Sequence, residues 1–253
     1  MKQLIVNADD YNLTPGVCRG ILTAHQEGVV TSTTFMVNLP GARAAAHLAG
    51  KNPELGVGLH LNLTKGNPVS PREKVPSLVQ ENGEFIPHKL HPQSRLSREE
   101  ILLEWEAQLQ KFIELLGKAP SHLDSHHHIH ALYLPVFFQL AQTHTLPVRT
   151  ITPEMAREAR LYGLKTCDYF IEDFFGDKVG LENLKELLTG IPSDSSCELM
   201  CHPGEPDEEL RKISSYSDNR RKELEVLTNP ELKKFLAGEQ IFLTGYARLG
   251  KKY

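Results

Sequence analysis

One short segment, residues 120–130, carries an unusual density of side chains that can bind a metal ion. It reads PSHLDSHHHIH and holds five of the twelve histidines of the chain together with Asp124. Neutral imidazoles and carboxylates are ligands for divalent transition metals such as zinc. A metal site that keeps one coordination position open can activate water for hydrolysis. The segment is therefore a candidate for part of a hydrolytic site.

The direction of each histidine depends on the local conformation of residues 122–128. In a strand the even-numbered side chains share one face, and these are His122, Asp124, His126 and His128. His127 would then face away, toward helices or the surface. In a helix the histidines at four-residue spacing would stack instead, namely His122, His126 and His130. Pro120 and the β-rich neighbouring segments favour the strand, and a solvated histidine-rich loop is the remaining alternative.

Ionisable residues also follow other apolar runs along the chain. Asp9 and Asp10 follow LIVNA, His60 lies late in LGVGLH, Arg149 ends PVR and His202 ends CELMCH. Each alone has an ordinary structural interpretation, such as a core hydrogen bond, a turn, a helix cap or an ion pair. Strands buried on both faces are nearly all apolar, however, and βα barrels build their active sites at the carboxyl ends of strands. We therefore expect these side chains to converge on one pocket.

This set of residue types suits metal-assisted hydrolysis. One aspartate of the Asp9–Asp10 pair can bind the metal, and the other can take a proton from water. Adjacent strand residues point to opposite faces, so the chain must bend at the strand end for both to reach the site. His202, from a distant strand, can donate a proton to the leaving group. The remaining polar residues of the cluster have second-shell or substrate roles: Asp124, His122, His128 and His130.

The elements that must position these residues follow an alternating pattern. Apolar, β-branched runs predict strands near residues 4–8, 29–39, 55–63, 122–128, 147–151, 167–172, 197–202 and 240–246. Helical periodicity predicts helices near residues 16–27, 42–50, 98–117, 132–145 and 219–227. Repeated βα units predict an α/β fold with a parallel sheet, and seven or eight such units favour a barrel.

The whole chain, residues 1–253, is expected to form one domain, because α/β barrels reach this length as single domains. Residues 65–96 interrupt the pattern with five prolines and indicate an inserted loop after a strand end, a candidate lid. Ser97 and Glu100 form a capping-box pattern that opens the following helix, and Gly117 is placed to end it.

Composition excludes several classes of function. The formal net charge is -4, and no basic run interleaved with aromatic residues is present, so nucleic acid is not an expected partner. The first apolar run has only four residues, and no later run is long enough to span a membrane. We therefore expect a cytoplasmic protein. Its four widely spaced cysteines are expected to be structural rather than disulfide-bonded.

Four motifs together resemble a known family. VNADDYNLT, GVGLHLNLT, HLDSHHHIH and ELMCHPGE are similar in order and spacing to motifs of the YdjC-like carbohydrate deacetylases, which include chitooligosaccharide deacetylase. The resemblance extends from about residue 4 to residue 246. It implies a distorted (β/α) barrel related to polysaccharide deacetylases, a divalent metal, a homodimer, and removal of acetyl groups from N-acetylated sugars or oligosaccharides.

The resemblance also implies roles for individual residues. It makes Asp10, His60 and His126 the metal ligands, Asp9 the base and His202 the acid, with Arg149 orienting Asp9. It implies Mg²⁺, whereas two imidazole ligands favour Zn²⁺ on chemical grounds. Two alternatives to a deacetylase remain: a metal-dependent phosphoesterase, which would favour two metals and cationic side chains, and a metal-storing or metal-sensing protein without catalysis.

Overall fold

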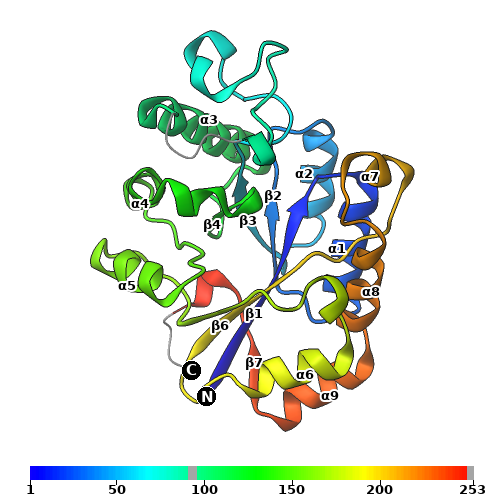
Figure 1. The fold of residues 1–253 in the computed structure, drawn as a ribbon. Helices are drawn as coiled ribbons and strands as arrows, with labels where there is room; N and C mark the ends of the chain where they lie inside the picture. Colours follow the sequence, from blue (N-terminus) through cyan, green and yellow to red (C-terminus); the bar gives the residue numbers. More distant parts are fainter. Residues whose placement is uncertain (91–95, 250–253) are drawn as a thin grey trace.

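The computed structural model of the chain describes residues 1–90 and 96–249, which fold into a curled parallel sheet with helices packed around it (Figure 1). Within these residues seven strands form: β1 Lys2–Tyr11, β2 Ser32–Phe35, β3 Gly56–Leu61, β4 Leu123–Ser125, β5 Tyr169–Ile171, β6 Ser196–Cys201 and β7 Ile241–Leu243. The same residues form nine α-helices: α1 Pro15–Gln26, α2 Ala42–Gly50, α3 Arg98–Leu116, α4 Leu134–Thr143, α5 Pro153–Leu161, α6 Leu181–Thr189, α7 Glu208–Ile213, α8 Asp218–Leu227 and α9 Pro230–Gly238.

The strands are all parallel and follow the order β4-β3-β2-β1-β6-β5, and β7 pairs with the beginning of β1. The central strand β1 pairs with β7 at Lys2–Leu4 and with β2 only from Asn7 onward. This change of partner lets the sheet curl. The predicted α/β fold with a distorted barrel is confirmed, and seven strands form.

The strand predicted at residues 147–151 is wrong. Val148 makes one isolated bridge to Leu123, and Arg149 N donates to Leu123 O. Helix α5 begins at Pro153 with Thr152 as its N-cap, so few residues remain for pairing after α4. Among the described residues the sheet therefore stays open between β4 and β5, with this short segment beside β4.

Alternation along β1 separates the outer core from the interior of the curl. Leu4, Val6 and Ala8 belong to the large apolar cluster that the surrounding helices share, whereas Ile5 packs in a small cluster that includes Tyr246. Successive side chains of a strand point to opposite faces, so Asn7 and Asp9 continue the inner face of Ile5. The carboxylate of Asp9 is thereby carried into the interior at the carboxyl end of the strand.

The ends of α3 follow the predicted signals with one exception, and α1 begins with an N-cap of the same kind. Thr14 Oγ1 accepts from Val17 N at the start of α1, Ser97 Oγ accepts from Glu100 N at the start of α3, and Gly117 closes α3 with φ 67°. The Glu100 carboxylate does not complete the capping box, because it accepts from Ser77 N at 2.7 Å instead. Glu100 therefore ties α3 to the segment that precedes it. No helix in residues 1–90 or 96–249 is both long and apolar enough to cross a membrane.

The segment between β3 and α3 lies at the end of the sheet toward which the strands point (Figure 1). Its described part contains three short 3₁₀ turns, Arg72–Lys74, Pro76–Leu78 and His88–Leu90, and an antiparallel bridge between Val79 and Phe85. Residues 91–95 of the predicted insertion are outside the described residues. The first part of this segment is held by the buried Glu104 of α3, whose carboxylate accepts from Val69 N at 2.9 Å and Ser70 N at 2.8 Å.

Replacing Glu104 by alanine is expected to lower the free energy of unfolding by about 2 kcal/mol, because two largely buried backbone N–H groups would lose their acceptor. The melting temperature would then fall by roughly 4–8 °C for a chain of this size. Thermal unfolding followed by circular dichroism tests this, with the exposed Glu114 of the same helix replaced by alanine as the control. Equal melting temperatures for the two variants would contradict the anchoring role of Glu104.

Candidate metal centre and active site

Asp10 lies where β1 bends. Its φ is 68°, a left-handed value, and the pairing of β1 with β2 shifts register between Ala8 and Tyr11. This irregularity turns Asp10 toward the same space as Asp9, although adjacent strand residues normally point apart. The bend expected at the strand end is therefore present.

Two histidine nitrogens converge on one oxygen of Asp10. The distance from Asp10 Oδ1 to His126 Nδ1 is 2.8 Å, and to His60 Nε2 it is 3.3 Å. Despite these distances, no donor within residues 1–90 and 96–249 has hydrogen-bond geometry to Asp10 Oδ1. The ligand atoms of the three residues lie within 4.8 Å of one another, and all three side chains are buried. An oxygen and two nitrogens that converge without hydrogen bonds fit the donor set of a divalent cation.

Burial and neighbouring charges shift the pKa values of the three side chains in this cluster. Burial alone would raise the pKa of Asp10, but His126 and Arg220 hold that pKa well below its usual range. Burial disfavours a charged His60, yet Asp124 and Asp10 raise the pKa of His60 to about 10. Burial lowers the pKa of His126 despite the nearby Asp10. The aspartate is therefore ionised and available as a ligand.

Asp124 lies directly behind His60. Its Oδ1 is 2.7 Å from His60 Nδ1, and its Oδ2 accepts from Thr34 Oγ1 at 2.9 Å. A carboxylate on one ring nitrogen fixes the tautomer and leaves the other nitrogen free to face a metal. Asp124 thus orients the His60 ring by holding the nitrogen that points away from Asp10.

Asp9 is clamped by Arg149. Arg149 Nη1 donates to Asp9 Oδ2 at 2.6 Å, and Nη2 donates to Asp9 Oδ1 at 2.7 Å. The guanidinium also binds Glu198 Oε1 and lies 3.0 Å from Asp124 Oδ2. Although burial opposes it, Arg149 lowers the pKa of Asp9. The geometry fixes both the orientation and the charge of the Asp9 carboxylate.

The strand conformation predicted for residues 122–128 is wrong in its second half. Strand β4 ends at Ser125, and a 3₁₀ segment follows over His126–Leu132. Inside it His127 and His128 have left-handed φ values of 57° and 51°. The alternation of side chains between the two faces of the strand therefore stops before His126. The turn that follows places the His126 ring beside Asp10.

His127 is exposed, as the expectation of a surface position required, but it does not face away from the pocket. His127 lines the cavity with His128, its ring lies 3.8 Å from the ring of His126, and its Nδ1 is 2.9 Å from Thr64 Oγ1. The left-handed backbone turns consecutive side chains to the same side, which strand alternation forbids. His128 also lines this cavity, and its Nδ1 is buried without a hydrogen-bond partner among the described residues.

Two further histidines of the cluster are parts of the core. His122 stacks on Tyr246 with ring centroids 3.7 Å apart, and burial lowers the pKa of His122 to about 3. His130 Nδ1 is 2.6 Å from Ser125 Oγ, and its ring packs on Phe137. Both are fully buried and absent from the cavity lining. Their contacts are those of neutral core side chains rather than of ligands.

His202 follows β6 and lies in an aromatic corner. Its ring is 5.6 Å from Phe175 and 5.8 Å from Tyr216, both at steep angles. Its backbone N–H donates to the buried Glu223, and its Nδ1 is buried without a partner among the described residues. Burial lowers the pKa of His202 to about 4. The ring is therefore neutral in this structure, and the residue lines the cavity.

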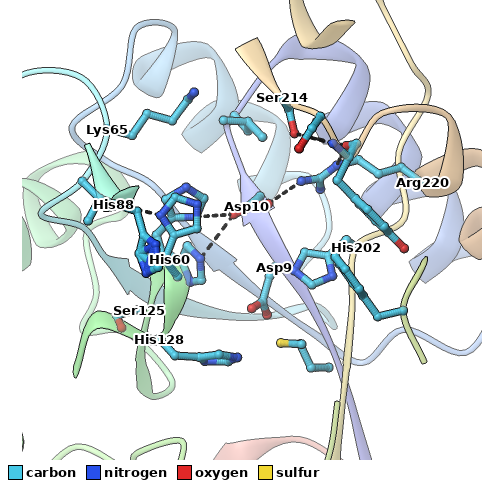
Figure 2. A pocket seen from close by; sticks show the side chains of 18 of the residues that line it. Asp9, Asp10, His60, Lys65, His88, Ser125, His128, His202, Ser214 and Arg220 are labelled. Carbon is cyan, nitrogen blue, oxygen red and sulfur yellow. Dashed lines mark hydrogen bonds and ion pairs between the residues drawn. The ribbon is translucent and has the colours of Figure 1, made fainter. Parts of the chain in front are cut away.

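Arg220, in the first turn of α8, reaches the other oxygen of Asp10. Arg220 Nη2 lies 2.5 Å from Asp10 Oδ2, and Nε donates to Tyr216 O at 3.0 Å. Figure 2 shows Asp10 with the histidines on one side and Arg220 on the other. One Asp10 oxygen is thus held by an internal cation, which leaves the other oxygen for a metal.

These groups surround one cavity of about 860 Å³. Asp9, Asp10, His60, His126 and His202, all predicted from the sequence, line it, and Figure 2 shows His202 on the far side of the aspartates from the histidines. The tertiary structure adds residues that the sequence reasoning missed: Arg220, Glu198, Glu223, Tyr216 and Phe175. A carboxylate inside the apolar run CELMC was a usable signal for Glu198.

Comparisons with known proteins agree on one family. Residues 3–238 match the family model described as YdjC-like protein. A carbohydrate deacetylase of Geobacillus stearothermophilus is 43% identical over 252 residues, which is 99% of each chain. A chitooligosaccharide deacetylase of Proteus mirabilis is 40% identical over 242 residues, with 92% of this chain and 93% of that protein covered.

A solved structure shares the fold of this chain. A protein of Enterococcus faecalis V583, described in terms of cellobiose-phosphate cleavage, superposes with a TM-score of 0.90 at 36% identity, with 97% of both chains covered. The resemblance carried by the four motifs is confirmed. With a family match and relatives that extend over nearly the full length, the chain belongs to the YdjC-like family.

Proposed function

We propose that this chain is a metal-dependent carbohydrate deacetylase that hydrolyses N-acetyl groups of amino sugars or their oligosaccharides, chitooligosaccharides among them. The observation that carries the proposal is the convergence of Asp10, His60 and His126 in a cavity that also holds Asp9 and His202. The names of the relatives support a carbohydrate substrate and hydrolysis of a C–N bond outside peptides.

The metal would be held by Asp10 Oδ1, His60 Nε2 and His126 Nδ1. A divalent ion at these atoms supplies Lewis-acid chemistry, because it polarises the acyl carbonyl and lowers the pKa of water. Asp124 holds the far nitrogen of His60, and Arg220 holds the far oxygen of Asp10, so both ligands are oriented in advance. The donor set suits Zn²⁺, while the family resemblance implies Mg²⁺.

Asp9 is the base of the proposed reaction. Arg149 keeps its carboxylate ionised and aimed into the cavity, so Asp9 can accept a proton from the attacking water. His202 is the acid that delivers a proton to the departing amine. Its low pKa means that the ring is neutral at rest, so His202 must first take up a proton from solvent in the cavity, and negative charge developing on the substrate favours that protonated form. The proton that Asp9 accepts from water returns to solvent in the same turnover, which balances the reaction.

The two alternatives agree less well with this geometry. A two-metal phosphoesterase would need a second ion, and Asp9, His60 and Asp124 do form a second group of possible ligands. Arg149 already lies 2.6 Å from Asp9 and 3.0 Å from Asp124, so a fixed cation balances those carboxylates. A storage or sensor protein would enclose its metal with protein ligands, whereas this cluster opens into a cavity.

Acetate release tests the proposed function directly. The wild-type protein, loaded separately with Mg²⁺ and Zn²⁺, is incubated with N-acetylated monosaccharides and disaccharides, and free acetate is measured. We expect release with at least one of the two metals and its loss after chelation. A protein that holds metal yet releases no acetate from any of these sugars would contradict the proposal.

Replacing His202 by alanine is expected to slow N-acetyl sugars by about 10²–10⁴-fold, the usual contribution of a positioned acid. Activated acetate esters should lose much less, because their leaving groups depart without protonation. Steady-state rates on one N-acetyl sugar and one activated ester measure the difference. Equal losses on the two substrates would show that His202 does not act as the acid.

A further inference from the structure

Phe175 is an exposed aromatic ring at the edge of the cavity. Its exposed fraction is 44%, whereas the preceding Phe174 is fully buried. The two phenylalanines follow β5, so Phe174 anchors the loop in the core while Phe175 faces the cavity. An exposed apolar ring contributes little to the stability of the fold, because it is not buried. Such rings in binding sites commonly serve as contact surfaces for ligands.

The ring of Phe175 is held rigidly on one face. It stacks on Tyr216 with ring centroids 4.1 Å apart and an interplanar angle of 9°. The Tyr216 hydroxyl donates to the buried Glu223 and accepts from Gly176 N at 3.2 Å. Two loops distant in the sequence are thereby joined, and these contacts position the ring without a ligand. A rigid surface binds with a smaller entropy cost than a mobile one.

The position of this ring relates it to the proposed chemistry. The centroid of Phe175 is 5.6 Å from that of His202, the proposed acid. Polar side chains of the same loop, Glu172, Asp173 and Lys178, also line the cavity and can bind hydroxyl groups. A flat apolar surface bordered by polar groups matches a pyranose, which has one face of C–H groups and a polar rim.

We propose that Phe175 is the stacking platform for the sugar ring of the substrate, and therefore a specificity-determining residue. The inference rests on the proposed deacetylase function, since it assigns the place of the sugar beside the acid. Tyr216 and Glu223 act through Phe175 as positioning residues. Substrates without a sugar ring make no use of this surface.

The test compares two substitutions of Phe175 with a matched control. Phe175→Leu keeps the apolar bulk and removes the aromatic face, and Phe175→Trp keeps a stacking surface. Phe242 has an exposed fraction of 46% and lies in β7, which pairs with the opposite end of β1, so Phe242→Leu is the control. The substrates are the β-1,4-linked disaccharide of N-acetylglucosamine and vinyl acetate, a small acyclic ester.

We expect Phe175→Leu to raise KM and the calorimetric Kd for the disaccharide about tenfold, the size of one aromatic stacking contact, and to change vinyl acetate hydrolysis by less than about twofold. Phe175→Trp should bind within about threefold of the wild type, because an indole also stacks. Phe242→Leu should match the wild type on both substrates.

Unchanged disaccharide binding in Phe175→Leu would overturn the platform. A loss of vinyl acetate hydrolysis in Phe175→Leu as large as the loss on the disaccharide would also overturn it. So would a loss of disaccharide binding in Phe175→Trp as large as that in Phe175→Leu, because either result would indicate a general distortion of the site. The calorimetric Kd separates this inference from the proposed function. A wild type that binds the disaccharide without releasing acetate contradicts deacetylation alone, and one that does not bind the disaccharide contradicts the platform.

Discussion

Replacing Asp9 by asparagine is expected to reduce acetate release from N-acetylated sugars by at least about 10²-fold, the usual contribution of a positioned base. Asparagine has nearly the same shape, but its amide cannot take a proton from water. The metal should remain, because Asp9 is separate from the convergent atoms of Asp10, His60 and His126. Turnover and metal content of the same preparation provide the measurement.

The control for this experiment must separate loss of the base from disturbance of the buried charges. Glu198 accepts from Arg149 Nε at 2.8 Å and Nη2 at 2.7 Å, so Glu198→Gln removes a carboxylate from the same guanidinium and keeps Asp9. We expect its rate to fall much less than that of Asp9→Asn. Equal losses in the two variants would indicate that ionic balance around Arg149 matters and that Asp9 is not the base.

Replacing His60 by alanine is expected to abolish tight metal binding and, with it, acetate release. His60 Nε2 is one of three convergent ligand atoms, and a divalent ion left with Asp10 and His126 would lose a third of its protein ligands. The substitution also leaves Asp124 without the imidazole that it orients. Metal content measured by atomic emission after gel filtration gives the result.

The exposed His47 of α2 gives a matched control, since His47→Ala removes an imidazole far from this cluster. That variant should keep its metal. Circular dichroism of His60→Ala shows whether the fold persists, so loss of metal can be separated from unfolding. Stoichiometric metal in a folded His60→Ala variant would rule out the ligand set of Asp10, His60 and His126.

Much of the fold could be predicted from the sequence, because strand patterns, helix periodicity and helix caps depend on residues close together in the chain. Helix α2 has the predicted bounds, residues 42–50, and the N-cap of α3 lies at the predicted residue Ser97. The failure at residues 147–151 has a physical cause. Strand formation depends on a partner of sufficient length, and here the start of α5 limits the segment to one bridge.

The network behind the site could not be predicted in the same way. Arg220 lies in a highly charged helix, NRRKELEVL, where one buried arginine has the same local pattern as its exposed neighbours. Its contact with Asp10 joins residues 210 positions apart in the chain. The same is true of Phe175, whose ring stacks on Tyr216 from another loop. Such contacts depend on how distant loops pack and have no periodic signal.

The sequence by itself determined that Asp9, Asp10, His60 and His202 would meet, because parallel strands bring their carboxyl ends to one edge whatever the details of packing. It also supplied residue types that suit the proposed acid, base and metal ligands. Only the tertiary structure decided which neighbouring histidines reach the cavity. His126, His127 and His128 all line it, while His122 and His130 are in the core. Left-handed backbone angles at two residues turn the chain after Ser125, and a change in so few dihedral angles overrides the alternation on which sequence reasoning depends.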